Sequence, residues 1–161
     1  QRIACITGNL HYQTAIERLE GYKTALKKHK LSVEEELIVI GDFHYESGYE
    51  GMKRLLALNE RPTAVFASND MMAFGAIQAV NELGFSVPGD VAVVGYDDIT
   101  FTMMFYPPLT TIRQPLFEMG SLAARGLIDR IIYGEKAEIV KKVLPVELVI
   151  RKSCGAALSH K

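Results

Sequence analysis

Residues 64–80, AVFASNDMMAFGAIQAV, contain the strand-to-helix transition on which the fold assignment depends. Residues 64–67 form a short apolar run, which is typical of a buried strand. Ser68 or Asn69 can then cap a helix, because both are preferred N-cap residues. Gly84 favours the end of that helix. The apolar positions that repeat at helical spacing between cap and glycine are Met72, Ala76 and Val80.

The same alternation extends in both directions from this segment. Apolar runs at 3–6, 37–40 and 91–96 predict three more strands, and amphipathic segments separate them. Two capping-box spacings predict where the first two helices start, and they are Thr14 with Glu17 and Ser47 with Glu50. The expected core positions of these helices are Ala15, Leu19, Tyr22, Leu26, Met52, Leu55 and Leu56.

Four strands with three intervening helices predict consecutive βαβ units. We therefore expect an α/β fold: a three-layer sandwich with a mainly parallel sheet and helices on both faces. The nearly continuous apolar character of the strands agrees with coverage of both faces. After Tyr96 the pattern changes to a loop, a short extended piece at 109–112, a long helix at about 116–133 closed by Gly134, and a strand at about 142–150.

Composition restricts the function classes. The chain has 161 residues, with 18 basic and 19 acidic side chains and a net charge of −1. A domain that grips DNA phosphates is usually basic, so this chain is not expected to be the part that does so. Two cysteines, Cys5 and Cys154, predict free thiols, one of them buried, and weakly favour the cytoplasm. No apolar run approaches the roughly 20 residues that span a bilayer.

The residues that directly follow each predicted strand are polar or aromatic. In an open parallel sheet, ligands bind beyond the carboxyl ends of the strands, so these loops should meet at one edge. Carboxylates and amides can hydrogen-bond to hydroxyl groups, and an aromatic ring can pack on a sugar or stack on a base. We therefore expect a binding edge for a polyhydroxylated or heteroaromatic ligand. Its candidate residues are Asn9, His11, Tyr12, Asp42, Phe43, His44, Ser68, Asn69, Asp70, Asp97 and Asp98.

Several of these residues also have a purely structural explanation. Asn69 and Asp70 are good helix caps, and Asp97 and Asp98 tolerate tight turns. A catalytic role has little motif support, because the sequence has no glycine-rich phosphate loop after the first strand and no G-x-S-x-G elbow. The four histidines show no metal-ligand spacing. We expect a non-catalytic domain without metal or cofactor, and an α/β enzyme using Asp97, Asp98 and His44 is the alternative.

A series of short motifs resembles the effector-binding core of the lactose/galactose-repressor (LacI/GalR) transcription regulators. The resemblance runs from about residue 3 to residue 154, and the whole series is far more specific than any one piece. The matching stretches are RLEGY (18–22), GDF (41–43), ESGY (46–49), FASNDMMAFGA (66–76), VPGDV (87–91), GYDD (95–98) and PLTTIRQP (108–115). The resemblance implies the type I periplasmic-binding-protein fold and the sensing of a sugar or a similar polar metabolite.

The resemblance also implies roles for individual residues. Arg18 corresponds to an arginine that holds the effector, although helical spacing alone would make it an ordinary surface residue. Asp97 corresponds to the aspartate that binds sugar hydroxyls or ribose. Phe43 corresponds to an aromatic that stacks on the effector, as in purine repressors. The implied ligand-binding set is Arg18, Phe43, Asn69, Asp70, Asp97 and Gln114.

The family layout further implies how the chain is divided. Residues 1–161 would be part of an effector-binding domain, with 1–113 and 142–154 forming mainly the C-terminal subdomain. The helix at 116–134 would belong to an N-terminal subdomain, and the helix-turn-helix is absent from this chain. The helix is therefore expected to associate with another surface or to be mobile. Its apolar positions are Ala124, Leu127, Ile128 and Ile131.

The implied partners are a small-molecule effector, a second copy of the chain in a homodimer, and operator DNA through the missing domain. The effector would be a sugar, or a nucleoside or purine, and no membrane is expected. The alternative within the same fold is a sugar-binding protein associated with transport.

Overall fold

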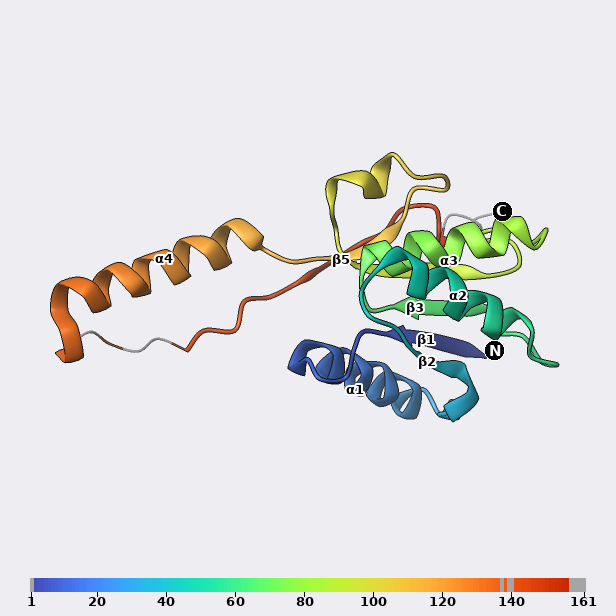
Figure 1. Ribbon diagram of the computed structural model, residues 1–161, viewed down its shortest axis with the longest axis horizontal. Helices are drawn as coiled ribbons and strands as arrows, with labels where there is room; N and C mark the ends of the chain where they lie inside the picture. The colour runs from blue at the N-terminus through green and yellow to red at the C-terminus, as the bar shows by residue number, and fades with distance from the viewer. Residues whose placement is uncertain (1, 137, 139–140, 157–161) are drawn as a thin grey trace.

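A computed structural model describes residues 2–136, 138 and 141–156 and contains a six-stranded sheet (Figure 1). The strand order is β2-β1-β3-β4-β5-β6. The first five strands are parallel, and β6 pairs with β5 in the antiparallel direction. The strands are β1 (Ile3–Thr7), β2 (Ile38–Ile40), β3 (Ala64–Ala67), β4 (Ala92–Asp97), β5 (Thr110–Arg113) and β6 (Glu147–Val149).

Three helices cover this sheet, and a fourth extends away from it (Figure 1). Helix α1 packs on one face, whereas α2 and α3 lie together on the other. This arrangement confirms the expected three-layer α/β fold with a mainly parallel sheet. The helices are α1 (Gln13–Lys28), α2 (Tyr45–Leu56), α3 (Asp70–Glu82) and α4 (Leu116–Tyr133), with short 3₁₀ segments at Glu35–Leu37, Thr100–Met103 and Gly134–Lys136.

Two apolar clusters hold the layers together, one on each face of the sheet. The larger lies between the sheet and helices α2 and α3. The smaller lies under α1, where Cys5 is buried with Leu19, Tyr22 and Leu26. All seven predicted core positions of the first two helices are buried. Both cysteines are free thiols, as expected, and Cys5 is the buried one.

The predicted capping boxes at the first two helices are wrong. Helix α1 begins at Gln13, so Thr14 is already inside it, and no side chain caps its first turn. Helix α2 begins at Tyr45, which places Ser47 inside α2. The Ser47 hydroxyl instead accepts a hydrogen bond from the backbone N–H of Asp42 at 3.1 Å and fixes the turn after β2. The expected cap of α3 is confirmed, because the Asn69 carboxamide oxygen accepts from the Met72 N–H at 2.9 Å.

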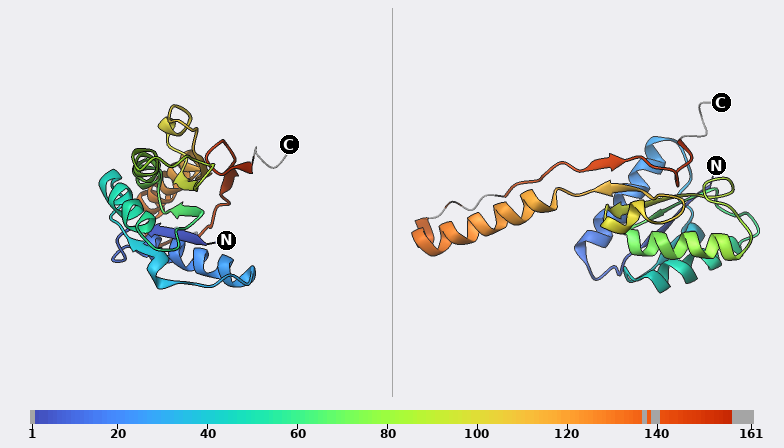
Figure 2. Two further views of the ribbon diagram at one scale, coloured as in Figure 1. Left: turned by 90° about the vertical axis from the view of Figure 1, so that its right-hand side faces the viewer. Right: turned by 90° about the horizontal axis from the view of Figure 1, so that it is seen from above.

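Helix α4 projects from the end of β5 as an arm, and the chain returns beside it to β6 (Figures 1 and 2). No residue of α4 is buried. The strand expected at 142–150 is limited to Glu147–Val149, because β5 has only four residues with which to pair. Among the described residues, no helix combines the length and the apolar character needed to cross a membrane. The exposed apolar side chains of α4 include Leu116, Phe117, Met119, Leu127, Ile128, Ile131, Ile132 and Tyr133.

Candidate ligand-binding site

The carboxyl ends of β1 to β4 lie along one edge of the sheet, since these strands are parallel and adjacent. The loops that follow them therefore meet at this edge, as expected from the sequence. Arg18 reaches the same edge from the first turns of α1, and Gln114 reaches it from the end of β5. These are the elements from which a ligand site can be built.

Arg18 is held in place by three kinds of contact. Its guanidinium carbon lies 3.8 Å from the centroid of the Tyr96 ring, an arrangement that favours cation–π attraction. One terminal nitrogen donates to the backbone oxygen of Ser68, and the other lies 3.5 Å from Asp97 Oδ1. The side chain is only 15% exposed. Arg18 is therefore a fixed cation at the edge of the sheet and not a mobile surface arginine.

Asp97 forms the centre of the site. Gln114 Nε2 donates to Asp97 Oδ1 at 2.7 Å, and Arg18 approaches the same oxygen. Among the described residues, no group donates a hydrogen bond to Oδ2, so this oxygen is available to a hydroxyl donor. Burial raises the pKa of Asp97, and the opposing effects of Arg18 and Gln114 do not fully compensate. In its ionised form this carboxylate can accept charge-assisted hydrogen bonds.

Phe43 supplies an aromatic wall beside this carboxylate. Its ring lies against Gly8, where an added Cβ would overlap the ring atoms. Asn69 Nδ2 donates to the backbone oxygen of Phe43 at 2.8 Å, and Phe43 has a left-handed backbone with φ of 73°. The Arg18 guanidinium carbon is 6.0 Å from the ring centroid, and the Tyr12 ring is 6.2 Å away. A flat or weakly polar ligand face can pack here next to Arg18 and Asp97.

Asp70 does not share this environment. It is 1% exposed, and both of its carboxylate oxygens have partners inside the protein. Oδ2 accepts from the Ile99 N–H at 2.9 Å, and Oδ1 accepts from the Thr111 hydroxyl at 2.5 Å. An added Cβ on Gly95 would overlap Oδ1. These contacts make Asp70 a link between the start of α3, β5 and the loop after β4.

We expect Asp70 to make folding depend on pH. Burial raises the pKa of Asp70 to about 6 from an ordinary value of 3.8. The protonated form therefore favours the folded state, and its contribution is fully present below pH 3.8 and lost as the pH rises through about 6. A shift of about two units corresponds to roughly 3 kcal/mol. Denaturant unfolding of Asp70→Asn from about pH 4 to 7 should lack this decline; an unchanged pH slope would contradict it.

Of the six predicted site residues, four come together: Arg18, Phe43, Asp97 and Gln114. Asn69 hydrogen-bonds to the backbone of Phe43 and so supports it, and the Asp70 carboxylate points into the protein interior. Sequence reasoning missed Tyr96, whose ring orients Arg18. The only signal for it was its place in the GYDD stretch directly before Asp97.

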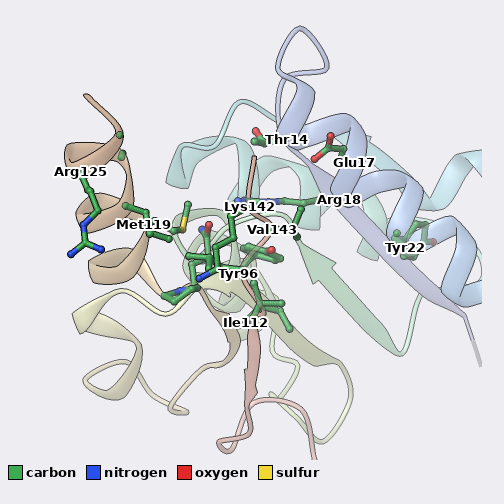
Figure 3. Close-up of a pocket in the computed structure, with 18 of the residues that line it drawn as sticks. Thr14, Glu17, Arg18, Tyr22, Tyr96, Ile112, Met119, Arg125, Lys142 and Val143 are labelled. Carbon is green, nitrogen blue, oxygen red and sulfur yellow. The ribbon is translucent and has the colours of Figure 1, made fainter. Parts of the chain in front are cut away.

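A groove of about 1030 Å³ adjoins the site, between α1 and the arm formed by α4 and the returning chain. Arg18, Tyr96 and Gln114 line its inner end. Figure 3 shows Arg18 and Tyr96 close together, with Met119 and Arg125 of α4 on the opposite side. The site is therefore open toward the arm, and access to it depends on where α4 lies.

Comparison with known proteins matches residues 1–154 to the model of the periplasmic binding protein-like domain. The HTH-type transcriptional repressor PurR of Mannheimia succiniciproducens is 43% identical over 153 residues, which are 95% of this chain and 46% of that protein. The ribose operon repressor of Escherichia coli is 48% identical over 130 residues, covering 81% of this chain and 39% of that protein. The chain thus spans about half the length of the curated relatives it matches.

Solved structures of transcription regulators resemble this chain as well. The transcriptional regulator CelR in complex with cellobiose has a TM-score of 0.89 and 43% identity, covering 94% of this chain and 46% of that one. The lac repressor dimer bound to operator and an anti-inducer has a TM-score of 0.86 and 34% identity, covering 95% of this chain and 52% of that one.

The fold places the chain in the class of type I periplasmic-binding-protein-like domains. The chain belongs to the periplasmic binding protein-like domain family, in the form that LacI/GalR regulators carry.

Proposed function

We propose that this chain is the effector-sensing part of a transcription repressor and that it binds a sugar or a similar small polar metabolite. The single observation that carries the proposal is the cluster at the sheet edge, where Arg18 and Gln114 both contact one oxygen of Asp97 and the described residues supply no donor to the other. Such a carboxylate beside the Phe43 ring suits a ligand with adjacent hydroxyls and an apolar face. The proposed site residues are Arg18, Phe43, Asp97 and Gln114, with Asn69 in support.

Control of DNA binding would follow from a shift between two conformations. An effector that contacts both the sheet edge and the arm side of the groove binds one arrangement of these parts more tightly. It can shift the equilibrium only by this difference in affinity. Operator DNA would be bound by a segment outside this chain, because the net charge here is −1. The relatives carry the names of repressors, which favours this function over transport or catalysis.

A homodimer in the cytoplasm is part of the same proposal. The lac repressor neighbour is described as a dimer. In this chain, the loop after β4 exposes several large apolar side chains, a feature that marks protein interaction surfaces. These side chains are Phe101, Met103, Met104 and Tyr106.

We further propose that α4 belongs to a second subdomain, whereas residues 1–113 and 142–154 form the sheet-based one. The support is that Leu127, Ile128 and Ile131 are 63%, 53% and 74% exposed. In this chain alone, α4 amides are expected to exchange with solvent far faster than those of β1 and β3, because few apolar contacts protect the helix. Hydrogen exchange measures this. A monomer whose α4 amides were as protected as the sheet would contradict the proposal.

Thermal-shift screening against sugars, nucleosides and purines tests the sensing function, with the protein at its full natural length. A ligand at ~100 times its Kd should add roughly 2.7 kcal/mol of stability. A hit that Asp97→Ala abolishes supports the proposal and identifies the effector class. A hit that both Asp97→Ala and Arg18→Ala leave unchanged would place the ligand elsewhere.

A further inference from the structure

Asp98 lies next to Asp97, has a largely buried side chain, and accepts hydrogen bonds from residues outside the proposed ligand site. Its side chain is only 8% exposed. Arg113 Nε and Arg151 Nη2 each donate to it at 2.6 Å, and the Thr102 hydroxyl donates at 3.2 Å. Burial alone would raise the pKa of Asp98, but the bonds from Arg151 and Arg113 outweigh burial and hold the pKa below its ordinary value.

The two arginines come from the outgoing and the returning segments that connect the sheet to α4. Arg113 is the last residue of β5, and the chain then leaves the sheet for α4. Arg151 follows β6, the strand on which the chain returns. The Nη1 atom of Arg151 donates to the backbone oxygen of Leu109 at 2.7 Å. One carboxylate therefore joins the outgoing strand and the returning segment, which are distant in sequence.

Two neighbouring residues at the end of β4, Asp97 and Asp98, each accept a hydrogen bond from a residue at the end of β5. The register places Asp97 opposite Arg113. Side chains directly opposite each other on neighbouring strands share a face, but the contacts at this strand end cross the register and form two separate sets. Asp97 accepts from Gln114 in the ligand site, and Asp98 accepts from Arg113 behind it. Asp97 and Asp98 have φ values of 119° and 57°, so the backbone leaves regular strand geometry here and their side chains need not follow the register.

We propose that Asp98 is a positioning residue that anchors the strand pair leading to α4 and thereby holds Gln114 against Asp97. The inference rests on the proposed function, in which a ligand can alter the contact between Asp97 and Gln114. The cluster of Asp98, Arg113 and Arg151 would then be the fixed point around which α4 moves. Asp98 does this through Arg113, the residue next to Gln114, without touching the ligand.

The test compares Asp98→Asn with Glu147→Gln by NMR on the protein without ligand. Glu147 is the matched control, because it pairs with the same arginine at 3.3 Å but is 68% exposed. Asp98→Asn should shift the Gln114 side-chain amide signal and speed exchange of the amides at 113–116 and 147–150 by about tenfold or more, with β1 and β3 unchanged. Glu147→Gln should leave all of these as in the parent protein.

A second variant keeps the test decisive if Asp98→Asn folds poorly. Arg113→Gln removes one donor from a half-exposed position and should produce the same local changes at Gln114. An unchanged Gln114 signal in both variants would overturn the proposal. A uniform rise in amide exchange over the whole sheet would also overturn the proposal, because it would show that Asp98 stabilises the whole protein and does not specifically anchor the segments leading to α4. No ligand is used, so a failed effector screen and a failed anchor give different results.

Discussion

Asp97→Ala should weaken effector binding by roughly 100-fold or more, since each hydrogen bond to a charged group contributes about 1.5–3 kcal/mol and every 1.4 kcal/mol corresponds to about tenfold in affinity. The free Oδ2 would bind the ligand directly, and the loss of Oδ1 would release Gln114 and Arg18 together. Titration calorimetry with the compound found by thermal shift measures the change.

Arg18→Lys should weaken binding by about tenfold or more even though the charge is kept. Lysine has neither the planar fork nor the flat face of arginine. It cannot reach the Ser68 oxygen and Asp97 while stacking on Tyr96, as Arg18 does. Lys23→Ala on the same helix is the matched control and should bind as the parent protein does, because Lys23 pairs with Glu20, at 3.8 Å, and not with a residue of the proposed site. Equal affinities in Arg18→Lys and the parent protein would remove Arg18 from the site.

The order of strands and helices was predictable because it depends on local periodicity. Apolar runs of four to six residues between amphipathic segments specify βαβ units, and the strand ends then fall at one edge. The helix starts were less predictable. Thr14 with Glu17 has capping-box spacing, yet α1 begins one residue earlier, and Glu17 accepts from Gln13 Nε2 at 3.0 Å. Spacing alone therefore does not decide which partner the Glu17 side chain takes.

The site was predictable in part, for a related reason. Position after a strand placed Phe43 and Asp97 at the edge, but the direction of each side chain depends on partners far along the chain. Asp70 lies directly after β3 like a ligand residue, and its carboxylate is nevertheless held by Ile99 and Thr111, 29 and 41 residues later. Arg18 required the family resemblance, because nothing in its helix indicates the Tyr96 ring.

Helices α2 and α3 pack so closely that Gly75→Ala should be strongly destabilising. A Cβ at Gly75 would overlap the backbone oxygen of Tyr45 and lie 2.7 Å from the backbone nitrogen of Tyr49. Both are main-chain atoms, so no side-chain rotation can relieve the overlap, and α2 must move. Overpacking of this kind costs about 1–3 kcal/mol and occasionally more. We expect the upper end of that range, or a fall in Tm of roughly 6–12 °C.

Gly21→Ala separates this effect from helix propensity. Gly21 lies within α1, and an added Cβ there meets nothing within 4 Å. The same substitution should therefore stabilise the protein by about 0.5–1 kcal/mol, since alanine is the better helix former. Denaturant unfolding should show changes of opposite sign in the free energy of unfolding of the two variants. If Gly75→Ala were as stable as Gly21→Ala, α2 and α3 would be farther apart than the structure shows.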